Sequence, residues 1–235
     1  MKPVLQTIQH AFQNQQKLLA ILIDPDKVEV SDMKVLCKRI AKAKADFIFI
    51  GGSTVDVGQT ERIAHEIKKN TLIPLILFPG DYTQLTNNAD ALLFLNLISG
   101  DNPHYLIQQQ VKSVLFLESS SLEVISTGYI LIDGGTITST MKVSQTNALS
   151  QHNIQLIQHT AKAGELMGQQ LIYLEAGSGA INPVSKHVVN TTFNSLNIPI
   201  IVGGGIRTSE QIQDAYHAGA TLVVVGTAFE NNEIF

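Results

Sequence analysis

The sequence predicts an α/β fold, namely a (β/α)8 TIM barrel, and three observations lead to this prediction. About eight short runs of Ile, Val, Leu and Phe alternate with stretches of helical pattern, which is typical of parallel strands covered on both faces. Nearly every run ends in Gly, Asp, Glu or Ser, at the end of the strand where barrel active sites lie. The last two runs end in glycine turns, the place where such barrels hold phosphate.

An open doubly wound sheet is the alternative architecture. Such a sheet normally carries its phosphate loop after the first strand, where this chain has Asp24-Pro25-Asp26-Lys27. The length of 235 residues is usual for one α/β barrel. We therefore expect a single domain over residues 1–235.

The composition excludes several classes of protein. A net charge of −4 and the lack of any Lys/Arg cluster argue against nucleic-acid binding. The single cysteine, Cys37, excludes an internal disulfide, and the polar start is unlike a signal peptide, so we expect a cytoplasmic protein. No apolar run approaches the roughly 18 residues of a spanning helix, so membrane contact is expected to be at most peripheral.

The expected elements follow one another in barrel order. Strands are expected within residues 18–24, 46–52, 72–80, 91–100, 128–135, 171–179, 198–205 and 221–227. Helices are expected at Ser31–Lys44 with a serine N-cap, and at Gln59–Asn70, Pro103–Glu118, Ile154–Met167, Pro183–Leu196 and Ser209–Ala218.

Two places interrupt the alternation of strand and helix. The dozen residues of Pro79–Asp90 lack a helical period and are rich in Gly, Asp and Asn, so we expect no regular third helix. Few residues follow Thr227, so the final helix is expected to be short or absent. The amphipathic opening segment Val4–Gln16 could cover that gap. A missing outer helix should expose apolar barrel wall and favour a homo-oligomer.

The polar, Thr/Ser-rich segment Gly134–Gln151 follows the fifth strand. Two interpretations of this segment are equally supported by the sequence: a mobile loop over the barrel mouth, or an ordered connector without a functional role.

Glycines at two neighbouring strand ends predict a phosphate site. The run PIIVGGGIR stops at Gly203–Gly205, which let the backbone approach an anion without interference from Cβ atoms. The next strand ends in Gly226 and Thr227. A tight turn without a ligand is the alternative, and the second matching turn argues against it.

The first two strands end in residues suited to Mg²⁺. Asp24 closes the first strand, and Ser53 follows the second after two glycines. Mg²⁺ takes one or two protein carboxylates and leaves its other positions to water and substrate phosphates. Asp24 taken alone is better explained as a turn or helix N-cap residue. The histidines are scattered, without transition-metal spacing.

The sixth strand ends in YLEAGSG, where Glu175 is our candidate for a general base. Glu175 precedes an anion turn of Gly177, Ser178 and Gly179, and Tyr173 projects to the same side of the strand. The alternative is a structural carboxylate that pairs with Arg207.

Read together, the motifs LIDPDK, IFIGGS, LFPG, FLNLISG followed by NP, GYILIDGG, YLEAGSGA, IVGGGIR and VVVGTAFE resemble the geranylgeranylglyceryl phosphate synthase family, which includes bacterial heptaprenylglyceryl phosphate synthases. The resemblance spans most of the chain, and the family similarly lacks the third barrel helix. The end at Phe235 is shorter than the family pattern, which puts closure of the barrel in question.

The resemblance implies transfer of an isoprenyl group, taken as geranylgeranyl, from its diphosphate to the 3-hydroxyl of sn-glycerol 1-phosphate. It implies that Asp24 and Ser53 hold Mg²⁺ and that Glu175 accepts the hydroxyl proton. The implied glycerol phosphate site consists of Tyr173, Leu174, Glu175, Ala176, Gly177, Ser178, Gly179, Gly204, Gly205, Gly226 and Thr227.

Two other classes of function stay open from the sequence. One is another phosphate-binding barrel enzyme, such as a metal-independent isomerase of amino-acid biosynthesis. The other is a non-catalytic phosphate-binding protein, against which Asp24 and Glu175 argue. The length of the prenyl chain is not encoded in any motif.

Overall fold

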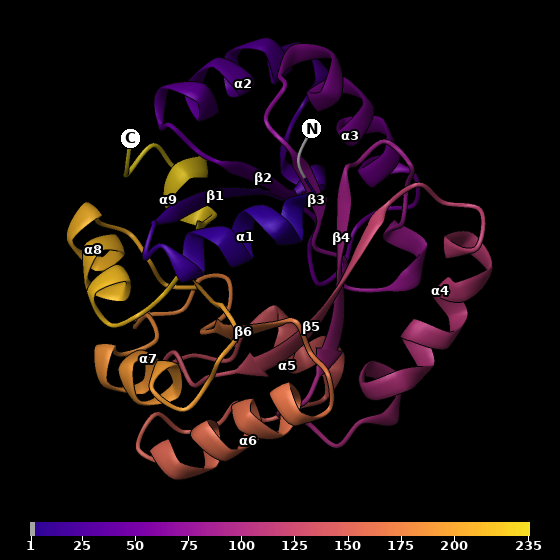
Figure 1. Cartoon of the computed structure of the whole chain (residues 1–235). Coiled ribbons are helices and arrows are strands. Elements are labelled where there is room, and N and C mark those ends of the chain that lie inside the picture. Colours follow the sequence, from indigo (N-terminus) through magenta and orange to yellow (C-terminus); the bar gives the residue numbers. More distant parts are fainter. Residues whose placement is uncertain (1–2) are drawn as a thin grey trace.

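The computed structural model describes residues 3–235, and its eight parallel strands close into a barrel in sequence order (Figure 1). The strands are β1 Leu18–Ile23, β2 Phe47–Ile50, β3 Leu75–Leu77, β4 Ala91–Leu97, β5 Glu123–Leu131, β6 Leu171–Glu175, β7 Ile200–Gly203 and β8 Leu222–Val225. β1 pairs with both β2 and β8, so the barrel is closed despite the end at Phe235. The predicted (β/α)8 barrel is confirmed.

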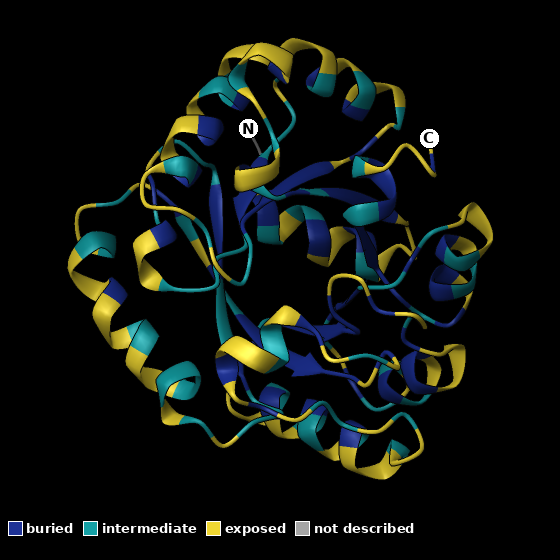
Figure 2. Ribbon diagram, turned by 180° about the vertical axis from the view of Figure 1, so that it is seen from behind, coloured by how far each residue is buried: buried dark blue, intermediate teal, exposed yellow. Residues whose placement is uncertain are grey.

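Most strands are buried on both faces, because successive side chains point into two different apolar layers, and only β4 and β5 carry several residues that are half-buried or exposed. Phe49 and Leu93 belong to the layer that fills the barrel interior. Ile48 and Leu92, their neighbours in the chain, belong to the layer between the barrel and the outer helices. Figure 2 shows the strands buried inside a ring of helices whose outer faces are exposed.

The expected outer helices are present with small changes of their bounds. They are α2 Met33–Lys42, α3 Gln59–Asn70, α4 Gln109–Leu117, α6 Ile154–Leu166, α7 Lys186–Phe193 and α8 Ser209–His217. The serine N-cap expected for α2 is wrong, because Ser31 lies in a 3-10 turn, η2 Val30–Asp32, that precedes the helix. Helix α7 starts after Pro183, because the Ser185 side chain caps it by accepting the Val188 N–H. A π-helix, η4 His104–Gln108, leads into α4.

The third barrel helix is missing, as predicted. Between β3 and β4 the chain makes only the 3-10 turn η3 Tyr82–Gln84, which the Asp81 side chain caps by accepting the Thr83 N–H. Helix α4 therefore faces a short turn on this side of the barrel.

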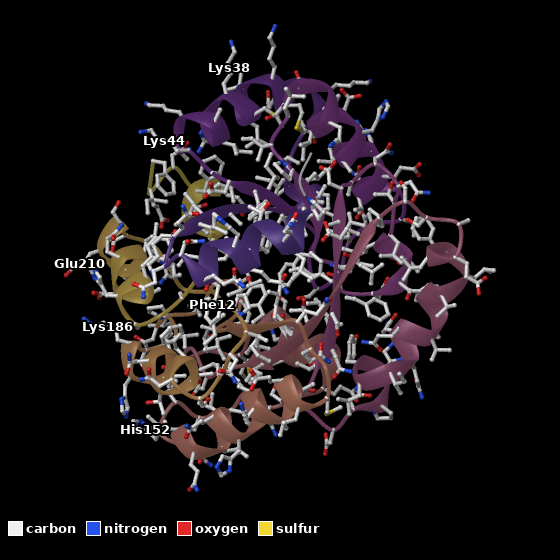
Figure 3. The ribbon with its side chains drawn as sticks, viewed as in Figure 1. Phe12, Lys38, Lys44, His152, Lys186 and Glu210 are labelled. Atoms are coloured by element: carbon white, nitrogen blue, oxygen red, sulfur yellow. The ribbon has the colours of Figure 1, made fainter. Side chains whose placement is uncertain are left out.

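The opening helix, α1 Val4–Gln13, does not cover the gap after β8, which corrects that expectation. Its N-terminal N–H groups donate to the carboxylate of Glu123, the first residue of β5. Its Ile8 belongs to the cluster that fills the barrel interior. Figure 1 shows α1 lying across the barrel, and its Phe12, marked in Figure 3, makes an edge-on contact with Phe193 of α7. The helix thus closes the amino-terminal end of the barrel.

The gap after β8 is filled by a short helix, α9 Thr227–Glu230. Arg39 of α2 donates to the Phe229 carbonyl oxygen at 2.7 Å, and its guanidinium lies 4.6 Å from the centre of the Phe229 ring. A cation at the carbonyl end of a helix is favourable, so one side chain holds this turn in place.

The segment Gly134–Gln151 contains a short helix, α5 Ser139–Ser144, and a bridge between Ile132 and Leu149. Thr138 caps α5 by accepting the Met141 N–H. The segment therefore has secondary structure of its own, and through α5 it reaches the mouth of the barrel. None of the helices in residues 3–235 has the length and apolar character needed to cross a membrane.

Candidate active site

A cavity of about 230 Å³ opens at the carboxyl end of the barrel. Most of the predicted site residues line it: Asp24, Ser53, Tyr173, Glu175, Ser178, Gly179, Gly204, Gly205, Gly226 and Thr227. The side chains of Leu174 and Ala176 do not reach it, because they face the layer between barrel and helices. Gly177 is not part of the lining either, and its N–H donates to Glu175 Oε1 at 2.7 Å.

The glycine turn after β7 lies directly against the turn after β6. Gly204 and Gly205 have φ of +81° and +70°, a conformation that disfavours other residues. A Cβ atom on Gly204 would lie 2.4 Å from both Glu175 Oε1 and the Gly177 nitrogen. The same turn after β6 also meets the turn after β8, since Ser178 Oγ lies 3.4 Å from Thr227 Oγ1. Hydroxyl groups and close backbone thus surround one small space, as an oxyanion would require.

Glu175 is buried in this space without a cationic partner among residues 3–235, with only 5% of its surface exposed. Burial raises the pKa of Glu175 to about 7. The Tyr173 hydroxyl and the Gly177 N–H act in the other direction, because they stabilise the carboxylate and lower the pKa. Arg207 does not pair with it, since the guanidinium donates to the carbonyl oxygens of Ala180 and Ile181. The alternative of a Glu175–Arg207 pair is therefore wrong.

Three aromatic rings form the floor of the cavity. The Phe78 and Tyr173 rings stack with centroids 5.2 Å apart, and the Tyr129 ring meets Tyr173 edge-on at 5.4 Å. The Tyr173 hydroxyl lies beside Glu175, but its geometry falls short of a hydrogen bond, and it has no partner among residues 3–235. This buried hydroxyl and the Glu175 carboxylate are both available to a ligand.

A second, mostly apolar cavity of about 120 Å³ adjoins the first. Phe78 and Tyr129 line both cavities, together with Gly52, Ser53 and Thr140. The rest of its wall comes from the turn around η3 and from β4, η4, α4 and α5, and includes Leu85, Leu93, Leu95, Leu97, Tyr105 and Val143. It lies where the third helix is missing. Neither Phe78 nor Tyr129 was predicted as a site residue, although each lies within a predicted strand.

Asp24 and Ser53 offer the oxygen ligands that Mg²⁺ prefers. Asp24 Oδ1 lies close to Gly52, since a Cβ atom there would be 3.7 Å away, and Ser53 is the next residue. Ser53 Oγ is within 3.0 Å of Thr140 Oγ1 of α5. One carboxylate and one hydroxyl next to an anion cavity fit a hard cation that keeps most of its water and substrate ligands. Residues 3–235 contain no group of three His, Cys, Asp or Glu side chains arranged for a metal.

Asp24 also fulfils the structural alternative considered from the sequence. It caps a 3-10 turn, η1 Pro25–Lys27, by accepting the Asp26 N–H at 3.2 Å. Its other oxygen lies 3.2 Å from Lys27 Nζ. Lys27 and Glu230 also line the polar cavity, and sequence analysis assigned them no role.

Comparison with known proteins identifies the family. The model of the PcrB family matches residues 12–234. The chain is 49% identical over 233 residues to the geranylgeranylglyceryl phosphate synthase of Zunongwangia profunda, covering 99% of both proteins. It is 34% identical to the Pyrococcus furiosus protein of the same name, covering 94% of this chain and 88% of the relative.

A solved structure agrees with these relatives. The (S)-3-O-geranylgeranylglyceryl phosphate synthase of Thermoplasma acidophilum, in complex with its substrate sn-glycerol-1-phosphate, superposes with a TM-score of 0.92 at 31% identity. The match covers 98% of this chain and 92% of that one.

Proposed function

The chain belongs to the PcrB family, and from this premise we propose that it transfers a prenyl group from its diphosphate to the 3-hydroxyl of sn-glycerol 1-phosphate. The names of its relatives support a prenyltransferase and favour the geranylgeranyl group. The observation that carries the proposal is the junction of a polar and an apolar cavity at Phe78 and Tyr129. A reaction between a phosphate-bearing alcohol and a long hydrocarbon needs two such spaces that meet. The metal-independent isomerase considered from the sequence has no such need for an apolar space.

The glycerol phosphate belongs in the polar cavity. Its phosphate would lie against the turns of Ser178, Gly204, Gly205 and Thr227, where hydroxyl groups and backbone surround the space. The Thermoplasma acidophilum relative is in complex with sn-glycerol-1-phosphate, which supports glycerol phosphate as the ligand of this cavity. The glycerol hydroxyl would then point toward Glu175 and the unpartnered Tyr173 hydroxyl.

Glu175 is proposed to accept the proton of the 3-hydroxyl. The glycerol oxygen forms a bond to the first carbon of the prenyl group, the bond from that carbon to the diphosphate breaks, and the proton passes to the carboxylate. A pKa of about 7 suits a base that works near neutral pH. The Tyr173 hydroxyl can hold the same oxygen by a hydrogen bond and orient it.

The hydrocarbon chain is assigned to the apolar cavity. The stacked rings at the junction would lie next to the allylic carbon, where positive charge develops as the diphosphate leaves. Aromatic faces stabilise cations and exclude water from the reacting carbon.

Asp24 and Ser53 are proposed to hold a Mg²⁺ ion, which would neutralise charge on the departing diphosphate. The two side chains lie at neighbouring strand ends and face the polar cavity.

The other components of our proposal are a single domain, a cytoplasmic location and a homo-oligomer. The free, buried Cys37 supports a reducing compartment, and the exposed Val111 and Leu115 of α4 support association.

The test is incubation of the protein with Mg²⁺, sn-glycerol 1-phosphate and prenyl diphosphates of several lengths, followed by mass spectrometry of the product. We expect a prenyl ether of glycerol phosphate and stoichiometric release of diphosphate. Glycerol 3-phosphate, the mirror-image substrate, is the control and should yield far less product. Release of diphosphate without an ether would contradict the proposal.

A further inference from the structure

Lys27 and Glu230 form a pair of charges at the cavity mouth that the reaction above does not use. Lys27 Nζ lies 3.2 Å from Asp24 Oδ2 and 3.2 Å from Glu230 Oε2. Glu230 Oε1 also accepts the N–H of Asp24 at 3.4 Å. All three residues line the polar cavity. One ammonium group is therefore shared between the candidate metal ligand and a carboxylate from the end of the chain.

The two partners of Lys27 differ in how they are held. Glu230 is the last residue of α9, and the preceding residue, Phe229, is buried and fixed by Arg39 through a hydrogen bond and a ring contact. The Glu230 side chain is 16% exposed, whereas the Lys27 side chain is 52% exposed. Glu230 is thus the anchored member of the pair, and Lys27 is the one that can move.

Asp24 faces two competing demands. Asp24 Oδ2 accepts from Lys27, whereas Oδ1 lies toward Gly52 and Ser53, so a divalent cation held there would share one carboxylate with the ammonium group, and the two positive charges would repel each other. With a divalent cation at Asp24 and Ser53, the Lys27 ammonium group would therefore be able to turn from Asp24 toward an anion in the cavity. Glu230 still holds the ammonium group at the mouth. Both oxygens of Glu230 already have protein partners, so Glu230 is suited to position Lys27 rather than to bind the metal.

We propose that the Lys27 ammonium binds the diphosphate of the prenyl donor, and that Glu230 is the positioning residue that keeps it at the mouth. The proposal rests on the proposed function, because it assigns the group that receives the leaving diphosphate. An ammonium offers three N–H donors and a full charge to phosphate oxygens. Lys27 then stabilises both the bound diphosphate and the charge that grows on it as the bond to carbon breaks.

The test measures binding of inorganic pyrophosphate by calorimetry, with and without Mg²⁺, so that it does not depend on turnover. We expect Lys27→Met to weaken pyrophosphate binding about tenfold in both conditions, as loss of one charge-assisted hydrogen bond at a half-exposed site predicts. Glu230→Gln should weaken it by a similar or smaller factor. Lys27→Arg keeps the charge and should retain most of the affinity.

A double variant tests whether Glu230 acts through Lys27. Lys27→Met combined with Glu230→Gln should bind pyrophosphate no more weakly than Lys27→Met alone, because Glu230 acts only by holding the Lys27 ammonium group, which Lys27→Met removes. Glu233→Gln, a change of a nearby exposed carboxylate, is the matched control and should bind like the unchanged protein. Thermal unfolding of each variant checks that the fold is intact.

Three results would overturn the proposal. They are unchanged pyrophosphate binding in Lys27→Met, additive losses in the double variant, and a lower affinity for Mn²⁺, measured by electron paramagnetic resonance, in Glu230→Gln. The last result would make Glu230 a metal ligand. Failure of the proposed function is a different result, since it would be the lack of an ether product from the unchanged protein.

Discussion

The two ends of the barrel surround their carboxylates differently, with half-buried carboxylates at one end and a buried one at the other. At the amino-terminal end, Asp90 is 2.7 Å from Lys68 Nζ and accepts the Leu75 N–H, and Glu123 accepts two N–H groups of α1. At the carboxyl end, Glu175 is buried without a cation among residues 3–235, and its pKa is raised to about 7. The first arrangement stabilises the fold. The second leaves a buried carboxylate without a compensating charge, which costs folding free energy but leaves the group free to act on a ligand. Changes at the two ends should therefore affect different properties.

The largest expected effect is on turnover in Glu175→Gln. Loss of the proton acceptor should lower kcat/KM by roughly 10²–10⁴, while the amide keeps most of the packing. In the unchanged protein kcat/KM should rise with pH through about 7, and the variant should lose this rise. Steady-state kinetics across pH measures both. Glu118→Gln, on the exposed end of α4, is the control, and normal turnover in Glu175→Gln would remove Glu175 from the reaction.

The second effect is a dependence of stability on pH that comes from the same carboxyl group. The folded protein holds Glu175 with a pKa of about 7, above the ordinary 4.5, so its proton is bound more tightly in the folded state. The associated stability is complete below about pH 4.5 and is lost as the pH rises through about 7, in total about 3 kcal/mol. Denaturant unfolding should show Glu175→Gln gaining stability relative to the unchanged protein across that window. Parallel curves for the two proteins would contradict the raised pKa.

The third effect is on ligand affinity in Gly204→Asp. A side chain there meets Glu175 and the Gly177 nitrogen, and its charge opposes the phosphate, so affinity for sn-glycerol 1-phosphate should fall about a hundredfold. Gly168→Asp is a matched control, because Gly168 has a similar φ of +92° and open space around it. The control should lose only about 1–2 kcal/mol of stability to backbone strain. Calorimetry on both variants separates strain from exclusion of the ligand.

The smallest effect is expected at the opposite end of the barrel. Asp90→Asn removes the ion pair with the half-buried Lys68 and weakens the bond to the Leu75 N–H. The free energy of unfolding should fall by about 1–2 kcal/mol, while kcat and KM stay unchanged. A loss of turnover without a loss of stability would break the distinction between the two ends.

The sequence determined the barrel and most of the candidate site. Parallel strands end at one edge, so residues that close successive apolar runs, such as Asp24, Ser53, Glu175 and Gly204, had to lie together. The missing third helix was equally visible, because Pro79–Asp90 is too short and polar to form one. Local pattern and strand direction were sufficient for these features.

Only the tertiary structure decided which side chains meet across distant segments. The amphipathic face of α1 fits any apolar surface, and the Glu123 carboxylate fixes it at the amino-terminal end of the barrel. Lys27 and Glu230 are 203 residues apart, and no local pattern predicts their pairing. The alternative partner of Glu175, Arg207, was wrong for the same reason, since its guanidinium donates to the backbone carbonyls of Ala180 and Ile181 instead. A strand end is fixed by local sequence, whereas the partner of a charged side chain depends on how the whole chain packs.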